Sequence, residues 1–293
     1  MKNLLRISDL SKRQITRILS RAGQLKRGKK SNILKDKIIA SLFFEPSTRT
    51  RLSFETAVLK LSGKIIGFSE PSGTSLNKGE SFNDTIKVIA QFADLLIIRH
   101  PQPHAVENIS KNISKPIINA GDGDNEHPTQ TLLDLFAILE TQKKLKNLEI
   151  AIVGDLKFGR VPHSLAQALQ LFNNNIYLVS PKSLKMPKEY LKNIKYIKTD
   201  RLHSIIPQMD IIYMTRIQKE RFKNMAEYNK IKNYFVLKAS DLKNAKNNLK
   251  ILHALPRINE IARDVDDTKY AYYFEQVKNG VFIRMALLEL MMK

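Results

Sequence analysis

Short apolar runs alternate with amphipathic stretches along nearly the whole chain. Runs rich in β-branched and aromatic residues, bounded by turn residues, are typical of buried strands. Stretches with apolar residues three or four positions apart are typical of helices that bury one face. A regular alternation of the two indicates βαβ units around parallel sheets. The sequence therefore predicts an α/β fold.

Two series of strands are predicted, one in each half of the chain. The first comprises 37–44, 64–68, 94–98 and 116–119. The second comprises 148–153, 175–179, 195–199, 210–214 and 249–252. Helices are predicted between and after the strands, at 47–61, 129–140, 164–172 and 281–292. This pattern predicts two mostly parallel sheets, each flanked by helices.

The domain boundary is predicted on the helix at 129–140, which a polar break at 141–147 follows. We expect a first domain at 1–133 and a second at 134–279, with the last helix, 280–293, packing back on the first. Because ligands of open α/β sheets bind beyond the carboxyl ends of the strands, we expect the active site in a cleft between the domains.

The composition excludes several classes of protein. No apolar run approaches the roughly 20 residues of a membrane-spanning helix, and the start of the sequence lacks the apolar stretch of a secretion signal. We therefore expect a cytoplasmic protein without a membrane partner. The chain has no cysteine, which excludes disulfides, thiolate nucleophiles and thiolate metal sites.

The charge is strongly positive, with 49 Lys and Arg against 28 Asp and Glu and a formal net charge of +21. Such an excess raises the alternative of a basic nucleic-acid-binding protein. The lysines are spread among asparagines, as at 242–250, without the interleaved aromatic residues of a base-stacking surface. This pattern is typical of a solvated face, so we expect no nucleic-acid partner. The excess charge would draw small anionic substrates toward a cleft.

The residues directly after the first predicted strand indicate a phosphate site. They read EPSTRTR at 45–51 and stand at the start of a predicted helix. Free backbone N–H groups at a helix start, hydroxyl groups and guanidinium groups all favour a phosphate. A helix cap with surface arginines would explain Ser47 or Thr48 singly, but not the whole run.

Polar residues follow the next strands as well. RHP at 99–101 and HPTQ at 127–130 supply a guanidinium, an imidazole and an amide, a set that can polarise a carbonyl oxygen and hold a planar amide. A lone histidine is more often structural than catalytic. The position of His127 after a strand favours a functional role, whereas His100 and His163 are expected to be structural.

The second half places further arginines and a glutamine after its strands. The segments are GDLKFGR at 154–160, TRIQ at 215–218 and HALPR at 253–257. An arginine-rich half opposite a phosphate-binding half predicts two anionic substrates. No strand is followed by the glycine spacing of a dinucleotide fold, and no cluster has the spacing of metal ligands. Neither a cofactor nor a metal is indicated.

Six segments resemble the catalytic chains of the aspartate carbamoyltransferase family, in the order of that family. They are FFEPSTRTRLSFE (43–55), RHP (99–101), HPTQTLLDL (127–135), GDLKFGR (154–160), MTRIQKER (214–221) and HALPR (253–257). The related ornithine carbamoyltransferases share the fold and an STRTR-like motif, but they characteristically carry a cysteine near the C-terminus, which this chain lacks. Carbamoyl transfer to ornithine is therefore the alternative activity.

The resemblance implies roles for particular residues. Carbamoyl phosphate would be bound by Ser47, Thr48, Arg49, Thr50, Ser75, Lys78, Arg99, His127, Gln130 and Leu255. Aspartate would be bound by Lys78, Arg160, Arg216, Gln218, Leu255 and Pro256. Catalysis would rest on Arg49, Thr50, Lys78, Arg99, His127 and Gln130.

The resemblance also implies the assembly and the reaction. The loop SGTSLNKGE, which carries Ser75 and Lys78, would complete the active site of a neighbouring subunit, so we expect a homotrimer. The sequence leaves open whether a separate regulatory chain is a further partner. The uncharged amine of aspartate would attack carbamoyl phosphate directly and release phosphate, an early step of de novo pyrimidine biosynthesis.

Two positions depart from the family pattern. Ala254 stands where the family usually has proline, which leaves a backbone carbonyl but a less rigid loop. Val161 and Pro162 replace a Thr-Val pair after Arg160. Proline is tolerated in the first turn of a helix, so we expect Arg160 to keep its place.

Overall fold

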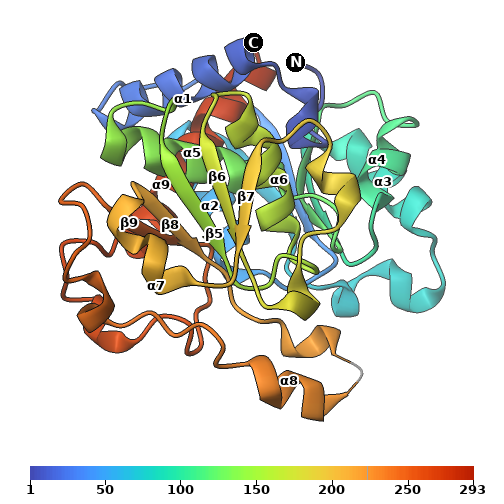
Figure 1. The fold of residues 1–293 in the computed structure, drawn as a ribbon. Helices are drawn as coiled ribbons and strands as arrows, with labels where there is room; N and C mark the ends of the chain where they lie inside the picture. Colours follow the sequence, from blue (N-terminus) through green and yellow to red (C-terminus); the bar gives the residue numbers. More distant parts are fainter. Residues whose placement is uncertain (223) are drawn as a thin grey trace. The chain divides into compact units, whose positions relative to one another are not determined.

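The computed structural model describes residues 1–222 and 224–293, which form two compact units. Unit 1 comprises Met1–Leu133 and Lys278–Lys293, and unit 2 comprises Asp134–Val277. The chain passes between the units within helix α5 (Pro128–Gln142) and again within helix α9 (Tyr273–Met291). Figure 1 shows the elements coloured along the chain.

Unit 1 is built on a parallel sheet of four strands in the order β2-β1-β3-β4. The strands are β1 (Ile38–Phe43), β2 (Lys64–Phe68), β3 (Leu95–His100) and β4 (Ile117–Asp122). The chain moves from β1 outward to β2 and then returns to the other side of β1 to form β3. This reversal makes the carboxyl ends of β1 and β3 the topological switch point, where open α/β sheets bind ligands.

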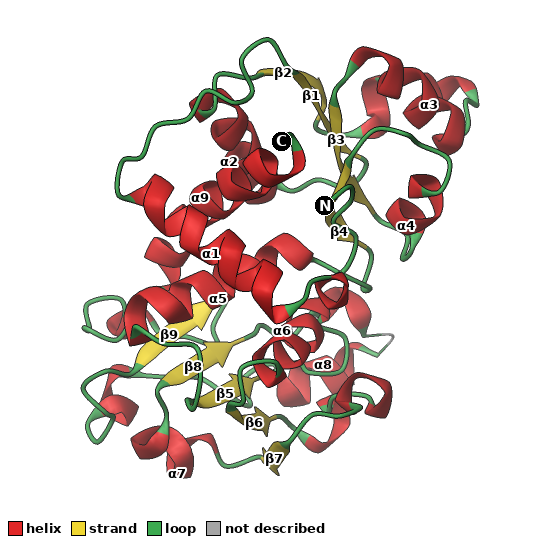
Figure 2. Cartoon of the chain, turned by 90° about the horizontal axis from the view of Figure 1, so that it is seen from above, coloured by secondary structure: helices red, strands yellow, loops and turns green. Residues whose placement is uncertain are grey.

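Helices cover both faces of this sheet, as buried parallel strands require. Figure 2 shows α3 (Phe82–Phe92) and α4 (Ala105–Ser110) on one face and α2 (Thr48–Lys60) on the other. The α3 and α4 face is closed by apolar packing. The buried residues of this cluster include Ala40, Leu42, Ile86, Ile98, Val106 and Ile109.

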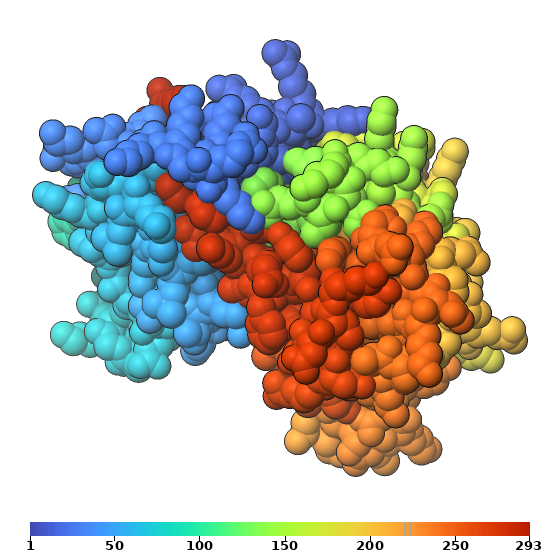
Figure 3. All heavy atoms as spheres, turned by 90° about the vertical axis from the view of Figure 1, so that its left-hand side faces the viewer, coloured from blue at the N-terminus to red at the C-terminus, as the bar shows by residue number. Residues whose placement is uncertain are grey.

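The two ends of the chain pack together in unit 1. Helix α1 (Lys12–Lys26) begins with a capping box, in which Ser11 and Gln14 exchange hydrogen bonds between side chain and backbone. Its Arg21 forms an ion pair with Glu289 of α9. Figure 3 shows the blue N-terminal segment in contact with the red C-terminal segment.

Unit 2 contains a parallel sheet of five strands in the order β7-β6-β5-β8-β9. The strands are β5 (Glu149–Val153), β6 (Asn175–Val179), β7 (Tyr196–Thr199), β8 (Ile211–Met214) and β9 (Lys250–His253). The chain runs outward from β5 to β7 and then returns to β8 on the other side of β5. The switch point of this unit therefore lies at the carboxyl ends of β5 and β8.

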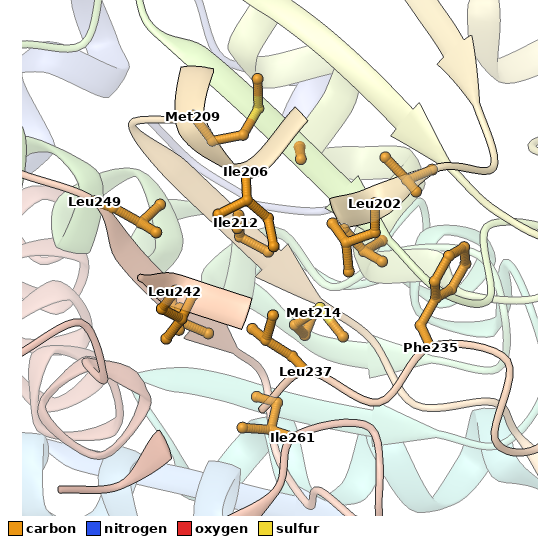
Figure 4. Packing of buried hydrophobic residues seen from close by; sticks show 14 of the residues in the cluster. Leu202, Ile206, Met209, Ile212, Met214, Phe235, Leu237, Leu242, Leu249 and Ile261 are labelled. Atoms are coloured by element: carbon orange, nitrogen blue, oxygen red, sulfur yellow. The ribbon is translucent and has the colours of Figure 1, made fainter. Parts of the chain in front are cut away.

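The core of unit 2 lies on one face of its sheet, against α7 (Leu202–Ile205) and the following segment. Figure 4 shows Ile212 and Met214 of β8 packed with Leu202 and Ile206. Figure 2 shows α6 (Arg160–Gln170) on the opposite face. A further helix of this unit is α8 (Met225–Ile231).

The predicted α/β class and the two parallel sheets are confirmed. Three details of the prediction were wrong or incomplete. Strand β3 includes Arg99 and His100, which were expected after the strand, because their backbones pair with Phe43 and Asp122. Helix α9 begins at Tyr273, eight residues before the predicted start. None of the predicted helix ranges covers α1, α3, α4, α7 or α8.

Within residues 1–222 and 224–293, no helix is long and apolar enough to cross a membrane.

Candidate functional site

The start of α2 lies at the switch point of unit 1, directly after β1. Ser47 is the N-cap residue, and its side chain makes no capping hydrogen bond. The hydroxyl therefore does not occupy the first N–H groups of the helix, which stay available to an anion. Thr48 and Arg49 are exposed and Thr50 is buried. The interpretation of Ser47 as a helix cap alone does not explain this arrangement of residues 47–50.

Arg99 brings a buried cation to the same edge of the sheet. Its side chain is 10% exposed, pairs with Glu45 at 2.7 Å and donates to the carbonyl oxygen of Ala120 at 3.2 Å. Burial lowers the pKa of Arg99, and the nearby positive charge of Arg49 lowers it further, whereas Glu45 opposes both effects. The positive charge of Arg49 therefore acts at Arg99, and Glu45 is the carboxylate that pairs with Arg99 at this edge of the sheet.

His127 and Gln130 stand at the start of α5, after β4. His127 is buried, and its Nε2 lies 3.5 Å from Oγ1 of Thr50. The backbone N–H of Gln130 donates to the carbonyl oxygen of His127 at 3.0 Å. The structure therefore joins the predicted residues of α2 and α5, which are 77 positions apart in the sequence.

Ser75 and Lys78 lie apart from this group. They belong to a short 3-10 helix, Ser75–Lys78, in the loop between β2 and α3, and both are exposed. In the described part of the chain, neither side chain forms a hydrogen bond or ion pair with the residues of α2, β3 or α5. Of the residues predicted to bind carbamoyl phosphate, Ser75 and Lys78 thus stand apart from the others in unit 1, and Leu255 belongs to unit 2.

His100 has a structural environment. It is buried, its Nδ1 accepts a hydrogen bond from the N–H of Gln102 at 3.0 Å, and its ring packs against Phe44 and Phe82. Burial lowers its pKa, which favours the neutral ring. These contacts agree with the structural role expected from the sequence.

At the switch point of unit 2, the backbone after β5 lies very close to the backbone after β8. Gly154 follows β5 with φ of +117°, and a Cβ placed on it would lie 2.2 Å from the carbonyl oxygen of Thr215, which follows β8. The N–H of Thr215 in turn donates to Val153 at 2.8 Å. Only glycine allows this approach, which brings the two loops that carry Arg160 and Arg216 to the same edge of the sheet.

Asp155 organises both loops. It is fully buried and accepts hydrogen bonds from the N–H groups of Lys157 at 3.1 Å and Phe158 at 3.0 Å, with the N–H of Gln218 at 3.5 Å. Burial raises the pKa of Asp155, and the three N–H groups and the charge of Arg221 oppose that rise. One carboxylate therefore fixes the path of the backbone on both sides of the switch point.

Arg160 is the first residue of α6, and Gly159 is its N-cap. Pro162 occupies the first turn, where its missing N–H has no partner within the helix. His163 follows it, buried, with Nε2 2.8 Å from the carbonyl oxygen of Leu156 and its ring stacked on Tyr190. Proline after Arg160 is therefore accommodated, and His163 has a structural environment.

A chain of buried hydrogen bonds leads to Leu255. Tyr213 donates to Asp134 at 2.9 Å, Gln276 donates to the other oxygen of Asp134 at 2.6 Å, and the N–H of His253 donates to Gln276 at 2.9 Å. The N–H of Leu255 then donates to Nδ1 of His253 at 2.7 Å. The backbone of this loop is thus set by side chains from α5, β8 and α9.

His253 is oriented from its other side by Glu260. Because Nδ1 accepts from Leu255, the ring proton is on Nε2, which donates to Glu260 at 2.7 Å. Leu255 adopts a left-handed conformation with φ of +57°, which is uncommon for a branched residue and is held here by these contacts. Pro256 follows it and is exposed.

Sequence reasoning gave no role to several of these residues. They are Glu45, Asp134, Asp155, Glu260 and Gln276. The sequence held a signal for three of them, since Glu45, Asp134 and Asp155 stand inside the quoted motifs. In the described ranges, no group of three or more His, Asp or Glu side chains is arranged to hold a metal ion.

Comparison with protein families matches the chain twice. Residues 2–140 match the carbamoyl phosphate-binding domain of the aspartate/ornithine carbamoyltransferases. Residues 146–291 match the aspartate/ornithine-binding domain of the same family.

Individual relatives are similar over almost the whole length. An aspartate carbamoyltransferase catalytic subunit 2 from Shewanella halifaxensis is 52% identical over 99% of this chain and 96% of its own. The aspartate carbamoyltransferase catalytic subunit of Chromobacterium violaceum is 50% identical over 99% of this chain and 98% of its own.

Solved structures show the same fold. The catalytic subunit of M. jannaschii aspartate transcarbamoylase has a TM-score of 0.92 and 43% identity, covering 99% of this chain and 98% of its own. The Trypanosoma cruzi aspartate transcarbamoylase in complex with carbamoyl phosphate and aspartate has a TM-score of 0.92 and 34% identity, covering 98% and 95%. The chain therefore belongs to the aspartate/ornithine carbamoyltransferase family, among the aspartate carbamoyltransferase catalytic subunits.

Proposed function

We propose that this chain transfers the carbamoyl group of carbamoyl phosphate to the amino group of L-aspartate, giving N-carbamoyl-L-aspartate and phosphate. The observation that carries the proposal is the site of unit 1. Arg49 in the first turn of α2 and Arg99 at the end of β3 bring two positive charges to the switch point, where Thr50 and His127 lie 3.5 Å apart. This set combines phosphate recognition with donors suited to a carbonyl oxygen.

Each residue of unit 1 has a proposed part. Ser47, Thr48 and the first N–H groups of α2 bind the phosphate together with Arg49. Arg99, Thr50 and His127 stabilise charge that develops on the carbonyl oxygen, a contribution typically worth several kcal/mol. Gln130 accepts a hydrogen bond from the carbamoyl nitrogen through its side-chain oxygen, and Leu255, which belongs to unit 2, offers its backbone carbonyl to the same nitrogen.

The reaction needs no covalent enzyme intermediate. The lone pair of the uncharged amine attacks the carbamoyl carbon, and a tetrahedral intermediate forms. The bond between that carbon and the bridging phosphate oxygen then breaks, and the amine proton is lost to the leaving phosphate. The protein contributes orientation of two bound substrates and stabilisation of the charges on oxygen.

Unit 2 is proposed to select the amine substrate. Arg160, Arg216 and Gln218 follow the two strands at its switch point, and they would hold the carboxylates of aspartate. Ornithine, the alternative substrate, carries a second amine in place of the side-chain carboxylate, and this pair of arginines would repel it.

The assembly is proposed to be a homotrimer with shared active sites. Its support is an exposed apolar set on the elements next to the Ser75–Lys78 helix. The set consists of Ile66 of β2, the strand before this helix, and Val88 and Phe92 of α3, the helix after it. Burial of these side chains against a second copy would be favourable, and the same contact would deliver Ser75 and Lys78 to the site of the neighbour.

The deciding experiment is a carbamoylation assay with purified protein and carbamoyl phosphate. Aspartate and ornithine are compared at equal concentrations, and the product is identified by mass. We expect N-carbamoyl-L-aspartate and phosphate in equal amounts, with at least about a hundredfold preference over ornithine, or roughly 2.7 kcal/mol. Equal rates with both amines, or transfer to ornithine alone, would refute the proposal.

Three further expectations extend the proposal. The enzyme acts in the cytoplasm and supplies an early intermediate of pyrimidine biosynthesis, which fractionation of cells and growth of a deletion strain on uracil would test. Light scattering of the purified chain would test the trimer. Association with a separate regulatory chain, which the sequence leaves open, would be tested by purification of the native complex.

A further inference from the structure

A pocket of about 200 Å³ opens in unit 2, away from its switch point. It lies at the carboxyl ends of the edge strand β7 and of its neighbour β6. Figure 1 shows these two strands side by side. Residues of unit 2 alone line the pocket, and none of them belongs to the site of the proposed reaction.

The face of the sheet on which the pocket lies follows from the strand register. Leu178 of β6 and Lys198 of β7 are register partners, so their side chains project from the same face. Tyr177 and Val179, their neighbours along β6, pack in the core cluster of Figure 4 on the other face. The pocket is therefore separate from that core and lies on the face that α6 covers.

The segment after β6 forms a wall of the pocket. Its Pro181, Leu184 and Met186 are buried and anchor the backbone, while Lys182 and Lys185, which alternate with them along the segment, are exposed. The carbonyl oxygen of Leu184 accepts a hydrogen bond from the N–H of Leu156 at 3.2 Å. Buried residues on both sides therefore hold the two lysines beside Lys198.

The charges of the pocket are unbalanced. Lys182, Lys185 and Lys198 all line it, and none forms an ion pair with a carboxylate in the described parts of the chain. Ser180, which is 6% exposed, also lines the pocket, and its hydroxyl makes no hydrogen bond with a described residue. Three cations and a hydroxyl donor favour an anion with several oxygen atoms.

The remaining wall residues narrow the class of ligand. Leu178 and Met186 are buried and give the pocket an apolar wall, which inorganic anions do not need. Asp200 stands at the same pocket and offers an acceptor for a hydroxyl group. Lysine binds phosphate as a point charge, whereas planar carboxylates are more often held by the fork of arginine.

We infer that this pocket binds a small phosphomonoester that carries a hydroxyl group. The ammonium groups and Ser180 would hold the phosphate, Leu178 and Met186 would contact the carbon atoms, and Asp200 would accept from the hydroxyl. The volume fits a compact metabolite and excludes a polymer as the occupant. The inference does not depend on the proposed reaction, because no residue is shared with that site.

The test uses methionine methyl groups of the full-length protein as local probes. The chain has eight methionines, of which Met186 is in the pocket wall, while Met209 and Met214 lie in the core cluster on the other face. Protein labelled with ¹³C at the methionine methyls is titrated with glycerol 3-phosphate and followed by NMR, and Met186→Leu assigns the signal. We expect a saturable shift of Met186 with a dissociation constant below about 1 mM at low ionic strength, and no shift of Met209 or Met214.

Two variants that lose the same number of positive charges distinguish binding in the pocket from nonspecific attraction of an anion to a basic protein. The triple change Lys182→Gln, Lys185→Gln and Lys198→Gln should weaken binding by at least about tenfold. The control triple Lys188→Gln, Lys192→Gln and Lys195→Gln removes equal charge from lysines outside the pocket and should leave the affinity within about twofold.

Three results would overturn the inference. The first is a Met186 signal that glycerol 3-phosphate leaves unchanged. The second is equal weakening by the two triple variants, which would mean diffuse attraction. The third is equal affinity for inorganic phosphate, which would mean that the carbon atoms and the hydroxyl contribute nothing.

Discussion

Replacing Gly154 by alanine is expected to destabilise the switch point of unit 2. The new Cβ would lie 2.2 Å from the carbonyl oxygen of Thr215 and 2.6 Å from its hydroxyl, so the backbone after β8 must move. The left-handed backbone, with φ of +117°, costs an alanine about 1–2 kcal/mol, and overpacking adds about 1–3 kcal/mol. The expected loss of stability is therefore about 2–5 kcal/mol.

Gly28→Ala is the matched control. Gly28 also has a positive φ, +96°, but a Cβ added to it would have no atom within 4 Å, so only the backbone strain of about 1–2 kcal/mol applies. The difference between the two variants isolates the contact with Thr215.

Hydrogen exchange of the amides of β5 and β8 measures the effect locally, which suits a protein of two units better than a single melting temperature. We expect faster exchange there in Gly154→Ala, and a weaker saturation by aspartate because Arg160 and Arg216 follow these strands. Exchange equal to that of Gly28→Ala, with normal aspartate kinetics, would refute the steric argument.

Three further predictions concern the proposed site. Arg49→Ala should nearly abolish transfer with the fold intact, whereas Arg51→Ala, which removes the partner of Glu55 on the same helix, should retain most activity; equal kinetics of the two would contradict the phosphate assignment. Inactive variants at Lys78 and His127 should regain partial activity when their subunits are mixed, and no recovery would mean self-contained sites. Arg216→Ala should weaken aspartate binding by about 2–5 kcal/mol but change the affinity for carbamoyl phosphate, measured by equilibrium dialysis, less than about tenfold. The reverse pattern would contradict the division of roles between the units.

Much of the fold could be predicted because its strands are continuous apolar runs, and strand ends are where α/β sheets place polar residues. The position of Arg49 at the start of α2 followed from that rule. The end of β3 could not be located in this way, because Arg99 and His100 are polar in sequence but pair within the sheet. Helix α1 carried a readable signal, the Ser11 and Gln14 capping box.

The contacts of the site could not be predicted from the sequence where they join residues that are far apart along the chain. Thr50 and His127 meet only because β1 and β4 belong to one sheet. The support of Leu255 through His253 and Gln276 likewise depends on the packing of α9, whose first eight residues were not predicted as helix. Local patterns predict which residues are polar, but tertiary contacts decide what they touch.

The hydrogen bond between Gln276 and Asp134 has a consequence for modularity. Unit 2 begins at Asp134 and ends at Val277, so this bond joins the two ends of one continuous segment. A segment whose ends lie close together can be replaced by another such segment. The rest of the chain keeps its path at the two junctions, and the entropy cost of closing the loop is small. Recombination at these two positions would thus give a carbamoyl phosphate unit a new amine-binding unit in a single insertion.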